Sequence, residues 1–165
     1  MLNDVSASLH EVAAAAGPGV AYVAMHMLGE PPTMQDDPRY DDVVGEVRSF
    51  LIARATAAVA AGVDEVWIDP GIGFGQGDAH NLALLAHLDE LVATGFPVVV
   101  GTSRKGFLGR LLDGALVDDR LEGSVATATW AMWQGARMVR AHDVRATVHA
   151  AQVVAGEIVK VPERS

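Results

Sequence analysis

Apolar residues along this chain form two alternating kinds of segment. In one kind they recur at helical spacing, as at Val43, Val47 and Leu51, and a glycine follows the segment as a left-handed C-cap. A second such helix is predicted over 82–92, with its apolar stripe at Leu82, Leu85, Leu88 and Val92. In the other kind they form short continuous runs, such as "VAYVAM" at 20–25, which are typical of parallel strands buried on both faces. This alternation predicts parallel βα units, with about five strands and about five helices.

Two architectures are built from such units: an open doubly wound sheet and a (β/α)8 barrel. A complete barrel needs roughly 200 residues or more, whereas this chain has 165. The predicted fold class is therefore α/β, either an open sheet or part of a barrel. We predict one domain over residues 1–158, with a Pro- and Asp-rich loop at 28–40, followed by a short tail at 159–165.

Composition and charge narrow the functional classes. The net charge of −9 argues against nonspecific binding to nucleic acid. No apolar run approaches the roughly 18 residues of a membrane span, and the first ten residues lack the basic and apolar regions of a signal peptide. The chain has no cysteine, which fits a reducing compartment and excludes thiolate metal sites. We therefore predict a cytoplasmic protein whose partners are small molecules, with neither nucleic acid nor membrane among them.

Polar side chains follow every predicted strand. Parallel α/β folds bind their ligands at the carboxyl ends of the strands, and the opposite ends of these strands carry mainly Gly, Pro and Ala. This asymmetry predicts one shared site. Its candidate residues, in chain order, are Asn3, Asp4, Met25, His26, Asp69, Ser103, Arg104, Lys105, Arg140, His142 and Asp143.

The stretch "DPGIGFGQG" begins at Asp69, directly after a buried run. An isolated Asp-Pro-Gly favours a simple turn. Three alternating glycines are more than a turn requires, and we interpret them as a mobile loop that offers Phe74 to a flat ligand. Asp69 could then accept paired hydrogen bonds from an amino-pyrimidinone ring.

Two further segments supply positive charge. Lys105 follows a buried strand and could reach a ring carbonyl or nitrogen, although a basic surface loop is equally compatible. Arg140 and His142 lie two residues apart and share one face of a strand, where they could hold a phosphate. The alternative is a structural histidine satisfied by Asp143.

Two candidates have stronger structural alternatives. Met25 is more typical of core packing than of a ligand site. Asn3 and Asp4 can cap a turn, and Asn3 can instead donate and accept in one plane at the edge of a heterocycle. Arg104, next to Lys105, must point elsewhere, toward a carboxylate on a neighbouring loop.

Taken together, these segments resemble dihydropteroate synthase. The matching stretches occur in the family's order and cover nearly the whole chain: "NDVSA", "MHMLGEPPTMQ", "DPGIGFGQGDAHNLALL", "GTSRKGFLG" and "RLEGSVATATWAMWQGARMVRAHDV". The resemblance implies a pterin-binding (β/α)8 barrel of which this chain supplies strands four to eight, so that residues 1–158 would be a partial domain. It implies a transferase that condenses 6-hydroxymethyl-7,8-dihydropterin pyrophosphate with 4-aminobenzoate in folate biosynthesis, a target of sulfonamides.

The resemblance also implies roles and partners. Mg²⁺ would be the cofactor, with its family ligand in the missing N-terminal part and no metal ligand in this chain. The assembly would be a homodimer. The residues with implied roles are Asp69 and Lys105 in catalysis; Asn3, Met25, Asp69 and Lys105 at the pterin; Arg140 and His142 at the pyrophosphate; and Phe74, Ser103 and Lys105 at the aminobenzoate.

The chain departs from the family pattern in two ways. It begins inside what resembles the fourth strand, without the earlier loop that carries an Asn-Val-Thr-Pro-Asp-Ser-Phe run, so we expect Met1 to be an internal start and this chain alone to lack activity. Gln76 and Gly77 stand where the family often has Lys and a small polar residue. The alternatives are a non-catalytic truncated pterin-binding paralogue, a pterin-dependent methyltransferase domain, against which "SRKGF" and "RAHDV" argue, and a structural α/β domain.

Overall fold

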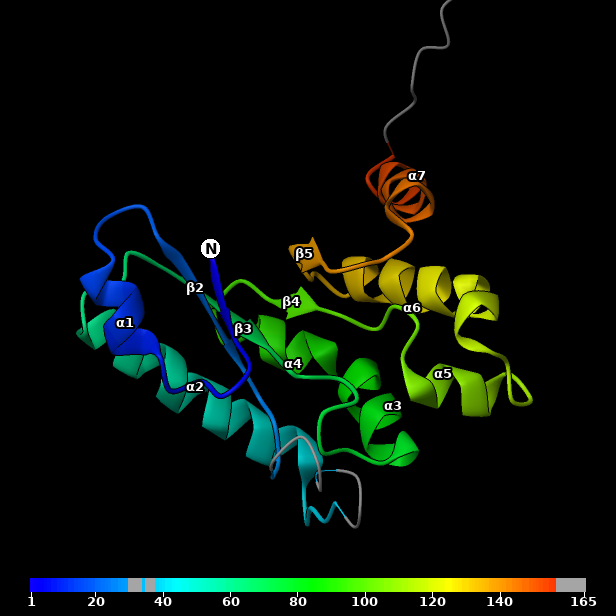
Figure 1. The fold of residues 1–165 in the computed structure, drawn as a ribbon, viewed down its shortest axis with the longest axis horizontal. Helices are drawn as coiled ribbons and strands as arrows, with labels where there is room; N and C mark the ends of the chain where they lie inside the picture. Colours follow the sequence, from blue (N-terminus) through cyan, green and yellow to red (C-terminus); the bar gives the residue numbers. More distant parts are fainter. Residues whose placement is uncertain (30–33, 35–37, 157–165) are drawn as a thin grey trace, which may run out of the picture.

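Five parallel strands run through the centre of the computed structural model, which describes residues 1–29, 34 and 38–156 (Figure 1). Their pairing follows chain order, first β1–β2–β3, then a bridge from Ile68 to Val98, then β4–β5. The predicted α/β class with parallel βα units is confirmed. The strands are β1 Leu2–Asp4, β2 Ala21–Met25, β3 Glu65–Asp69, β4 Val99–Val100 and β5 Met138–Val139.

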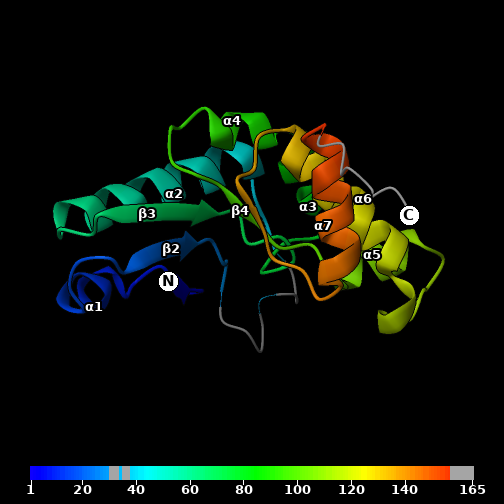
Figure 2. The same ribbon diagram turned by 90° about the horizontal axis from the view of Figure 1, so that it is seen from above.

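Helices connect successive strands, and Figure 2 shows α2 running alongside β3 while α6 and α7 lie beyond β4. The described residues contain seven α-helices rather than about five, because the predicted helix over 82–92 is two helices and because α5 was not predicted. The chain leaves helical geometry at His87, which ends α3. The helices are α1 His10–Ala15, α2 Val43–Ala60, α3 Asp78–Ala86, α4 Leu88–Val92, α5 Gly106–Leu111, α6 Leu121–Trp133 and α7 Val144–Val154, with a 3₁₀ turn at Val117–Asp119.

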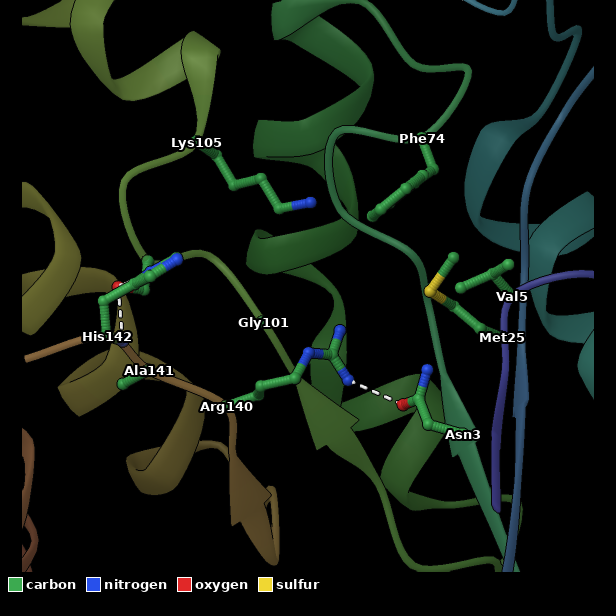
Figure 3. A pocket seen from close by; sticks show the side chains of 10 residues that line it. Asn3, Val5, Met25, Phe74, Gly101, Lys105, Arg140, Ala141 and His142 are labelled. Carbon is green, nitrogen blue, oxygen red and sulfur yellow. Dashed lines mark hydrogen bonds between the residues drawn. The ribbon is translucent and has the colours of Figure 1, made fainter. Parts of the chain in front are cut away.

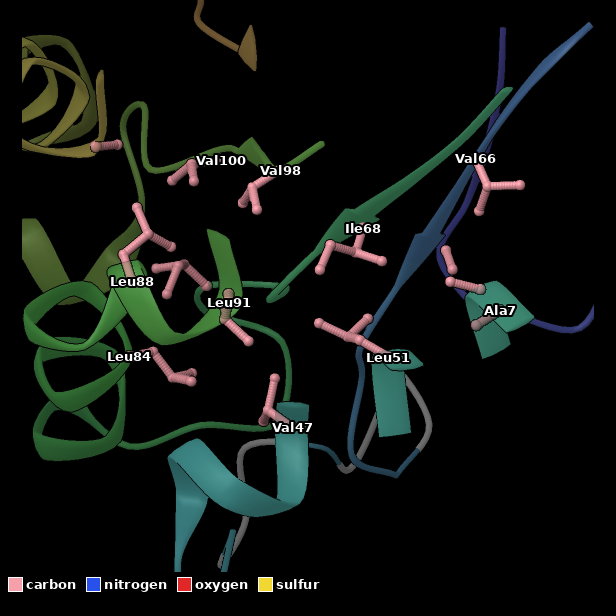
Figure 4. Packing of buried hydrophobic residues seen from close by; sticks show 14 of the residues in the cluster. Ala7, Val47, Leu51, Val66, Ile68, Leu84, Leu88, Leu91, Val98 and Val100 are labelled. Atoms are coloured by element: carbon pink, nitrogen blue, oxygen red, sulfur yellow. The ribbon is translucent and has the colours of Figure 1, made fainter. Parts of the chain in front are cut away.

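The core lies between α2, α3, α4 and the strands (Figure 4). On α2 the predicted apolar stripe faces inward, with Val47 and Leu51 fully buried against the same cluster as Ile68 of β3. The predicted stripe over 82–92 is wrong at Leu82, which is exposed, and right at Leu85 and Leu88, which are buried; Leu84 is buried as well. His87 separates α3 from α4, and Leu88 and Leu91 of α4 are buried in the same core as Leu84 of α3.

The two ends of the strand series are open within the described residues. β1 pairs only with β2, and β5 pairs only with β4. Unpaired backbone groups at such edges are available to pair with another strand. No helix in the described part of the chain is long and apolar enough to cross a membrane. The predicted tail at 159–165 lies outside the described residues.

Asp4 has a structural role at the end of β1, as the turn-capping alternative proposed. Its buried carboxylate accepts hydrogen bonds from the backbone N–H groups of Ser6 (2.9 Å) and Leu9 (2.7 Å) and from the hydroxyl of Tyr22 (2.9 Å). Burial alone would raise the pKa of Asp4, but these hydrogen bonds together lower it below 3.8, the ordinary value. The ionised carboxylate therefore joins β1 to β2 and to the start of α1.

We expect Asp4→Asn to lower the free energy of unfolding by about 1–3 kcal/mol at pH 7, because an amide nitrogen cannot accept these hydrogen bonds. A depressed carboxyl pKa stabilises the fold above 3.8 and stops doing so as the pH falls through the native pKa. The difference between the two proteins should therefore shrink in strong acid. Urea unfolding at pH 7 and below pH 4 measures it, with Asp64→Asn, an exposed aspartate, as the control. A constant difference at both pH values would contradict this role.

Candidate active site

A cavity of about 280 Å³ lies at the carboxyl ends of the strands, and residues at or just after the ends of all five strands contribute to it (Figure 3). The parallel arrangement brings these ends to one edge, which explains why polar residues distant in sequence meet here. Six of the eleven candidate residues line this one cavity; the other five do not, namely Asp4, His26, Asp69, Arg104 and Asp143. It is lined by Asn3, Val5, Met25, Phe74, Gly101, Ser103, Lys105, Arg140, Ala141 and His142.

Asp69 lies beneath this cavity rather than in its lining. Its side chain is only 1% exposed, and Oδ2 accepts a hydrogen bond from Arg140 Nη2 at 2.9 Å. Oδ1 accepts the backbone N–H of Gly71 at 2.8 Å. Burial raises the pKa of Asp69, whereas Arg140 and the Gly71 N–H oppose that rise. Arg140 thus supplies the opposite charge that a buried carboxylate requires.

The same guanidinium also reaches β1. Arg140 Nη1 donates to Asn3 Oδ1 at 2.9 Å, as the dashed line in Figure 3 shows. Asn3 and Asp69 are both expected to contact a pterin ring, and Arg140 is expected to contact the pyrophosphate. In the structure Arg140 joins the other two residues through hydrogen bonds. The sequence placed all three in one site but did not predict that Arg140 would contact the other two.

Lys105 and Phe74 face each other across the cavity. The Lys105 ammonium lies 3.8 Å from the centre of the Phe74 ring, which is close enough for a cation–π interaction. Burial lowers the pKa of Lys105, and the charge of Arg140 lowers it further, while Asp69 acts in the opposite direction. The lysine is thus a partly desolvated cation that contacts an aromatic ring.

The glycine loop after β3 is held by buried amides. The backbone N–H of Gly73 donates to Gln76 Oε1 at 3.0 Å and to Asn81 Oδ1 at 2.7 Å, and Gln76 Nε2 donates to the Pro70 carbonyl at 3.0 Å. Gly71 has a φ of 66°, and a Cβ there would overlap the carbonyl oxygen of His26. The glycines therefore meet backbone requirements, and these hydrogen bonds hold the loop in the conformation described, while its predicted mobility stays a prediction.

The backbone of the loop that carries Lys105 is also held by hydrogen bonds with Arg120 and Ser124. Arg120 Nη1 donates to the carbonyls of Arg104 (3.0 Å) and Lys105 (3.4 Å), and its Nε donates to Ala115 (2.9 Å). Ser124 Oγ accepts the backbone N–H of Arg104 at 3.0 Å. These contacts hold Arg104 at a φ of 58°, which is unusual for a residue with a side chain. Sequence reasoning missed Arg120 and Ser124, because both lie at the start of α6, away from any strand end.

Arg104 does point to a carboxylate on a neighbouring loop, as expected. Its Nε and Nη2 donate to the two oxygens of Asp143 at 3.1 and 2.8 Å. His142 therefore does not rely on Asp143; its ring nitrogen Nδ1 lies 3.0 Å from Ser103 Oγ, and its backbone N–H donates to the same oxygen at 3.1 Å. The structural alternative for His142, satisfaction by Asp143, is wrong.

Met25 and His26 point in opposite directions. Met25 lines the cavity, whereas His26 packs edge-on against Phe50 of α2, with ring centres 5.1 Å apart. Burial lowers the pKa of His26 to about 4, so its imidazole is neutral at pH 7. Among the described residues, no group of three or more His, Asp and Glu side chains converges in a way that could hold a metal ion.

Parallel βα units whose strand ends share one polar cavity place this chain among the α/β proteins, a class in which ligands bind at the carboxyl edge of the sheet. The model of a family described as pterin binding enzyme matches residues 1–142. The chain belongs to this family.

Curated relatives include the dihydropteroate synthases of Neisseria meningitidis serogroup B, 45% identical over 163 residues, and of Mycobacterium leprae, 48% identical over 167 residues. Each alignment covers 93% of this chain but only 56% and 58% of the relative, so the chain spans little more than half their length. The solved dihydropteroate synthase of Thermus thermophilus in complex with 6HMPPP superposes with a TM-score of 0.88 at 46% identity, covering 94% of this chain and 63% of that one. A Yersinia pestis dihydropteroate synthase with a sulfonamide drug complex gives 0.87 at 41% identity, covering 93% and 57%.

Removal of the Arg120 side chain should release Lys105 into solvent and raise its pKa toward the ordinary 10.5. A Cβ at Gly109 would lie 2.5 Å from Arg120 Nη2, so Gly109→Ala should displace the guanidinium and produce the same rise. In the double variant the second change should add nothing. NMR titration of lysine labelled at Cε measures this, because the sequence has only Lys105 and Lys160.

Arg110→Ala is the matched control. Arg110 lies on the same helix as Gly109 but pairs with Asp78, with no contact to the carbonyls of the lysine loop. It should leave the Lys105 signal unchanged. Additive pKa shifts from Gly109→Ala and Arg120→Ala, or an unchanged Lys105 in either, would show that Arg120 does not position the lysine.

Proposed function

We propose that this chain provides the pterin and diphosphate sites of a dihydropteroate synthase. The reaction condenses 6-hydroxymethyl-7,8-dihydropterin pyrophosphate with 4-aminobenzoate to 7,8-dihydropteroate and pyrophosphate. The observation that carries this proposal is the convergence of Asn3, Lys105 and Arg140 on one cavity, with the buried Asp69 hydrogen-bonded to Arg140 beneath it. The sequence identity to named dihydropteroate synthases, and solved relatives in complex with 6HMPPP and with 4-aminobenzoate, support it.

The pterin ring is flat and carries adjacent N–H donors on its amino-pyrimidinone edge. A carboxylate accepts two such donors side by side, and an amide can both donate and accept in the same plane. We assign the first role to Asp69 and the second to Asn3. Met25 supplies a polarisable surface for one face of the ring, and Lys105 reaches a ring heteroatom from the opposite side.

The diphosphate is assigned to Arg140 and His142. In the reaction, the aminobenzoate nitrogen attacks the exocyclic methylene carbon, a C–N bond forms, and the C–O bond to the diphosphate breaks. The nitrogen then releases one proton, and the departing diphosphate carries the electron pair of the broken bond. Positive charge near the departing oxygens stabilises the transition state, and Lys105 and Arg140 are placed to supply it.

The aminobenzoate is assigned to the region of Phe74, Ser103 and Lys105. Phe74 gives an aromatic surface, and the Lys105 ammonium contacts that ring directly. Ser103 is turned toward His142, so its role at the aminobenzoate is carried by the resemblance rather than by its present contacts. A sulfonamide would compete for this region, as the drug complex of the Yersinia pestis relative suggests.

Magnesium does not fit the donor set of this chain on its own. Asp69, the buried carboxylate of the site, already accepts from Arg140 and Gly71, and no cluster of three His, Asp or Glu side chains exists in the described part of the chain. We therefore derive no step through a metal ion held by these residues. Mg²⁺ stays a prediction of the family resemblance.

A homodimer stays part of the proposal. The helices after β4 expose large apolar side chains, with Trp133 of α6 at 74% and Val153 of α7 at 80%. Contiguous exposed apolar surface favours association. A cytoplasmic location is likewise proposed from the sequence.

A second candidate is a pterin-binding protein without turnover. The observation that favours it is that Ser103, one of the residues assigned to the aminobenzoate, is turned toward His142 and not toward that region. Binding and turnover therefore need separate measurements. Calorimetry with the pterin pyrophosphate reports binding, and release of pyrophosphate in the presence of 4-aminobenzoate reports turnover.

We expect Asp69→Asn to weaken binding of the pterin pyrophosphate by about 10²-fold, because the amide turns an N–H donor toward ring donors. The native chain should bind the compound in the micromolar range or tighter. Asp78→Asn is the control, since Asp78 is an aspartate paired with Arg110 outside this cavity. A loss of less than threefold in Asp69→Asn would exclude Asp69 from pterin recognition.

A further inference from the structure

The guanidinium of Arg140 is hydrogen-bonded to Asn3 and Asp69, the two residues assigned to the edge of the pterin ring. It donates to Asn3 Oδ1 and to Asp69 Oδ2, each at 2.9 Å. The side chain of Asp69 is 1% exposed, so a ligand cannot reach it unless a covering group moves. Arg140 is the exposed partner of this pair, at 44%, and it is the group that can leave.

The two competing groups are chemically alike. A guanidinium is a planar N–C–N unit with N–H donors on adjacent nitrogens, and the amino-pyrimidinone edge of a pterin has the same planar unit and the same donors. Both satisfy a carboxylate oxygen and an amide oxygen held on one side of a cavity. The ring and Arg140 therefore compete for the same acceptors.

The cavity also offers Arg140 a place to move. His142 lies two residues further along and lines the same cavity, so an anion there would be shared by both side chains. The guanidinium passes over Gly101, where a Cβ would lie 2.7 Å from Nη2, so the missing side chain leaves its path open. An anionic group offers an arginine a paired, charge-assisted contact that replaces its carboxylate partner.

We propose that Arg140 is a specificity-determining residue that makes recognition of the pterin ring conditional on an attached diphosphate. In the free chain its guanidinium occupies the hydrogen-bond acceptors of Asn3 and Asp69 that a bound ring would use. When a diphosphate binds, Arg140 pairs with it, and the acceptors on Asn3 and Asp69 become available to the ring. A pterin without diphosphate must displace Arg140 and offers it no new partner. This inference rests on the proposed function, because it takes the ring and diphosphate sites from it.

The first test uses no pterin. Inorganic pyrophosphate is titrated into the native chain, and the Arg140 Nε–H signal, assigned by its loss in Arg140→Leu, is followed by NMR together with the carboxyl signal of Asp69. We expect both signals to move with one saturation curve, because departure of the guanidinium removes the charge partner of Asp69. If pyrophosphate leaves the Asp69 signal unchanged, the proposal is overturned, whatever the chain does with pterins.

The second test measures coupling between the two halves of the ligand. The dissociation constant of 6-hydroxymethylpterin is determined by calorimetry with and without saturating pyrophosphate. In the native chain pyrophosphate should tighten binding of the pterin alcohol about fivefold or more, which is the usual lower range of coupling between sites. Arg140→Leu should bind 6-hydroxymethylpterin at least as tightly as the native chain does. Pyrophosphate should change the dissociation constant of this variant by less than about twofold. These measurements are made at mildly alkaline pH, which keeps Asp69 ionised after its charge partner is removed.

Arg137→Leu is the matched control, because Arg137 precedes the same strand at its opposite end and its side chain is exposed. It should keep the native coupling. Coupling that persists in Arg140→Leu, or that is absent from the native chain, overturns the proposal. If pyrophosphate moves Arg140 and Asp69 but no pterin binds in any state, then the proposed function fails and the specificity role fails with it.

Discussion

The buried carboxylate of Asp69 is the constraint on which the rest of the site depends. A carboxylate shielded from water must be neutralised by a proton or satisfied by donors. Here the donors are the Gly71 N–H, which requires a left-handed backbone beside His26, and the guanidinium of Arg140, which requires the end of β5 to face the end of β3. One buried charge therefore ties the glycine loop and the two halves of the strand series into a single arrangement.

The side chains that face the cavity are presented by loops with their own buried supports. Gln76 and Asn81 hold the loop of Phe74 through the Gly73 N–H, and Arg120 holds the carbonyls of the loop of Lys105. Such supports keep polar groups in place before a ligand arrives, which is where most electrostatic stabilisation of a transition state originates. Gln76, which departs from the family pattern, thus makes its hydrogen bonds inside the loop and does not line the cavity.

The residues proposed for the ring and the diphosphate interact with one another more directly than those proposed for the aminobenzoate. The groups proposed for the ring and the diphosphate come from β1, β2, β3, β4 and β5 together, and they interact directly in the free structure. The aminobenzoate side rests on Phe74, Ser103 and Lys105, and the chain spans little more than half the length of its curated relatives.

The sequence by itself determined the class of fold and most of the cavity lining, because strand and helix periodicities are local and parallel strands bring their carboxyl ends to one edge. Asn3, Met25, Phe74, Ser103, Lys105, Arg140 and His142 all line the predicted cavity for this reason. Only the tertiary structure decided which of these residues contact one another, since the Arg140 bridge between Asn3 and Asp69 joins strands far apart in the chain. It also decided the helix break at His87 and the support from Arg120, because both depend on packing that no local pattern encodes.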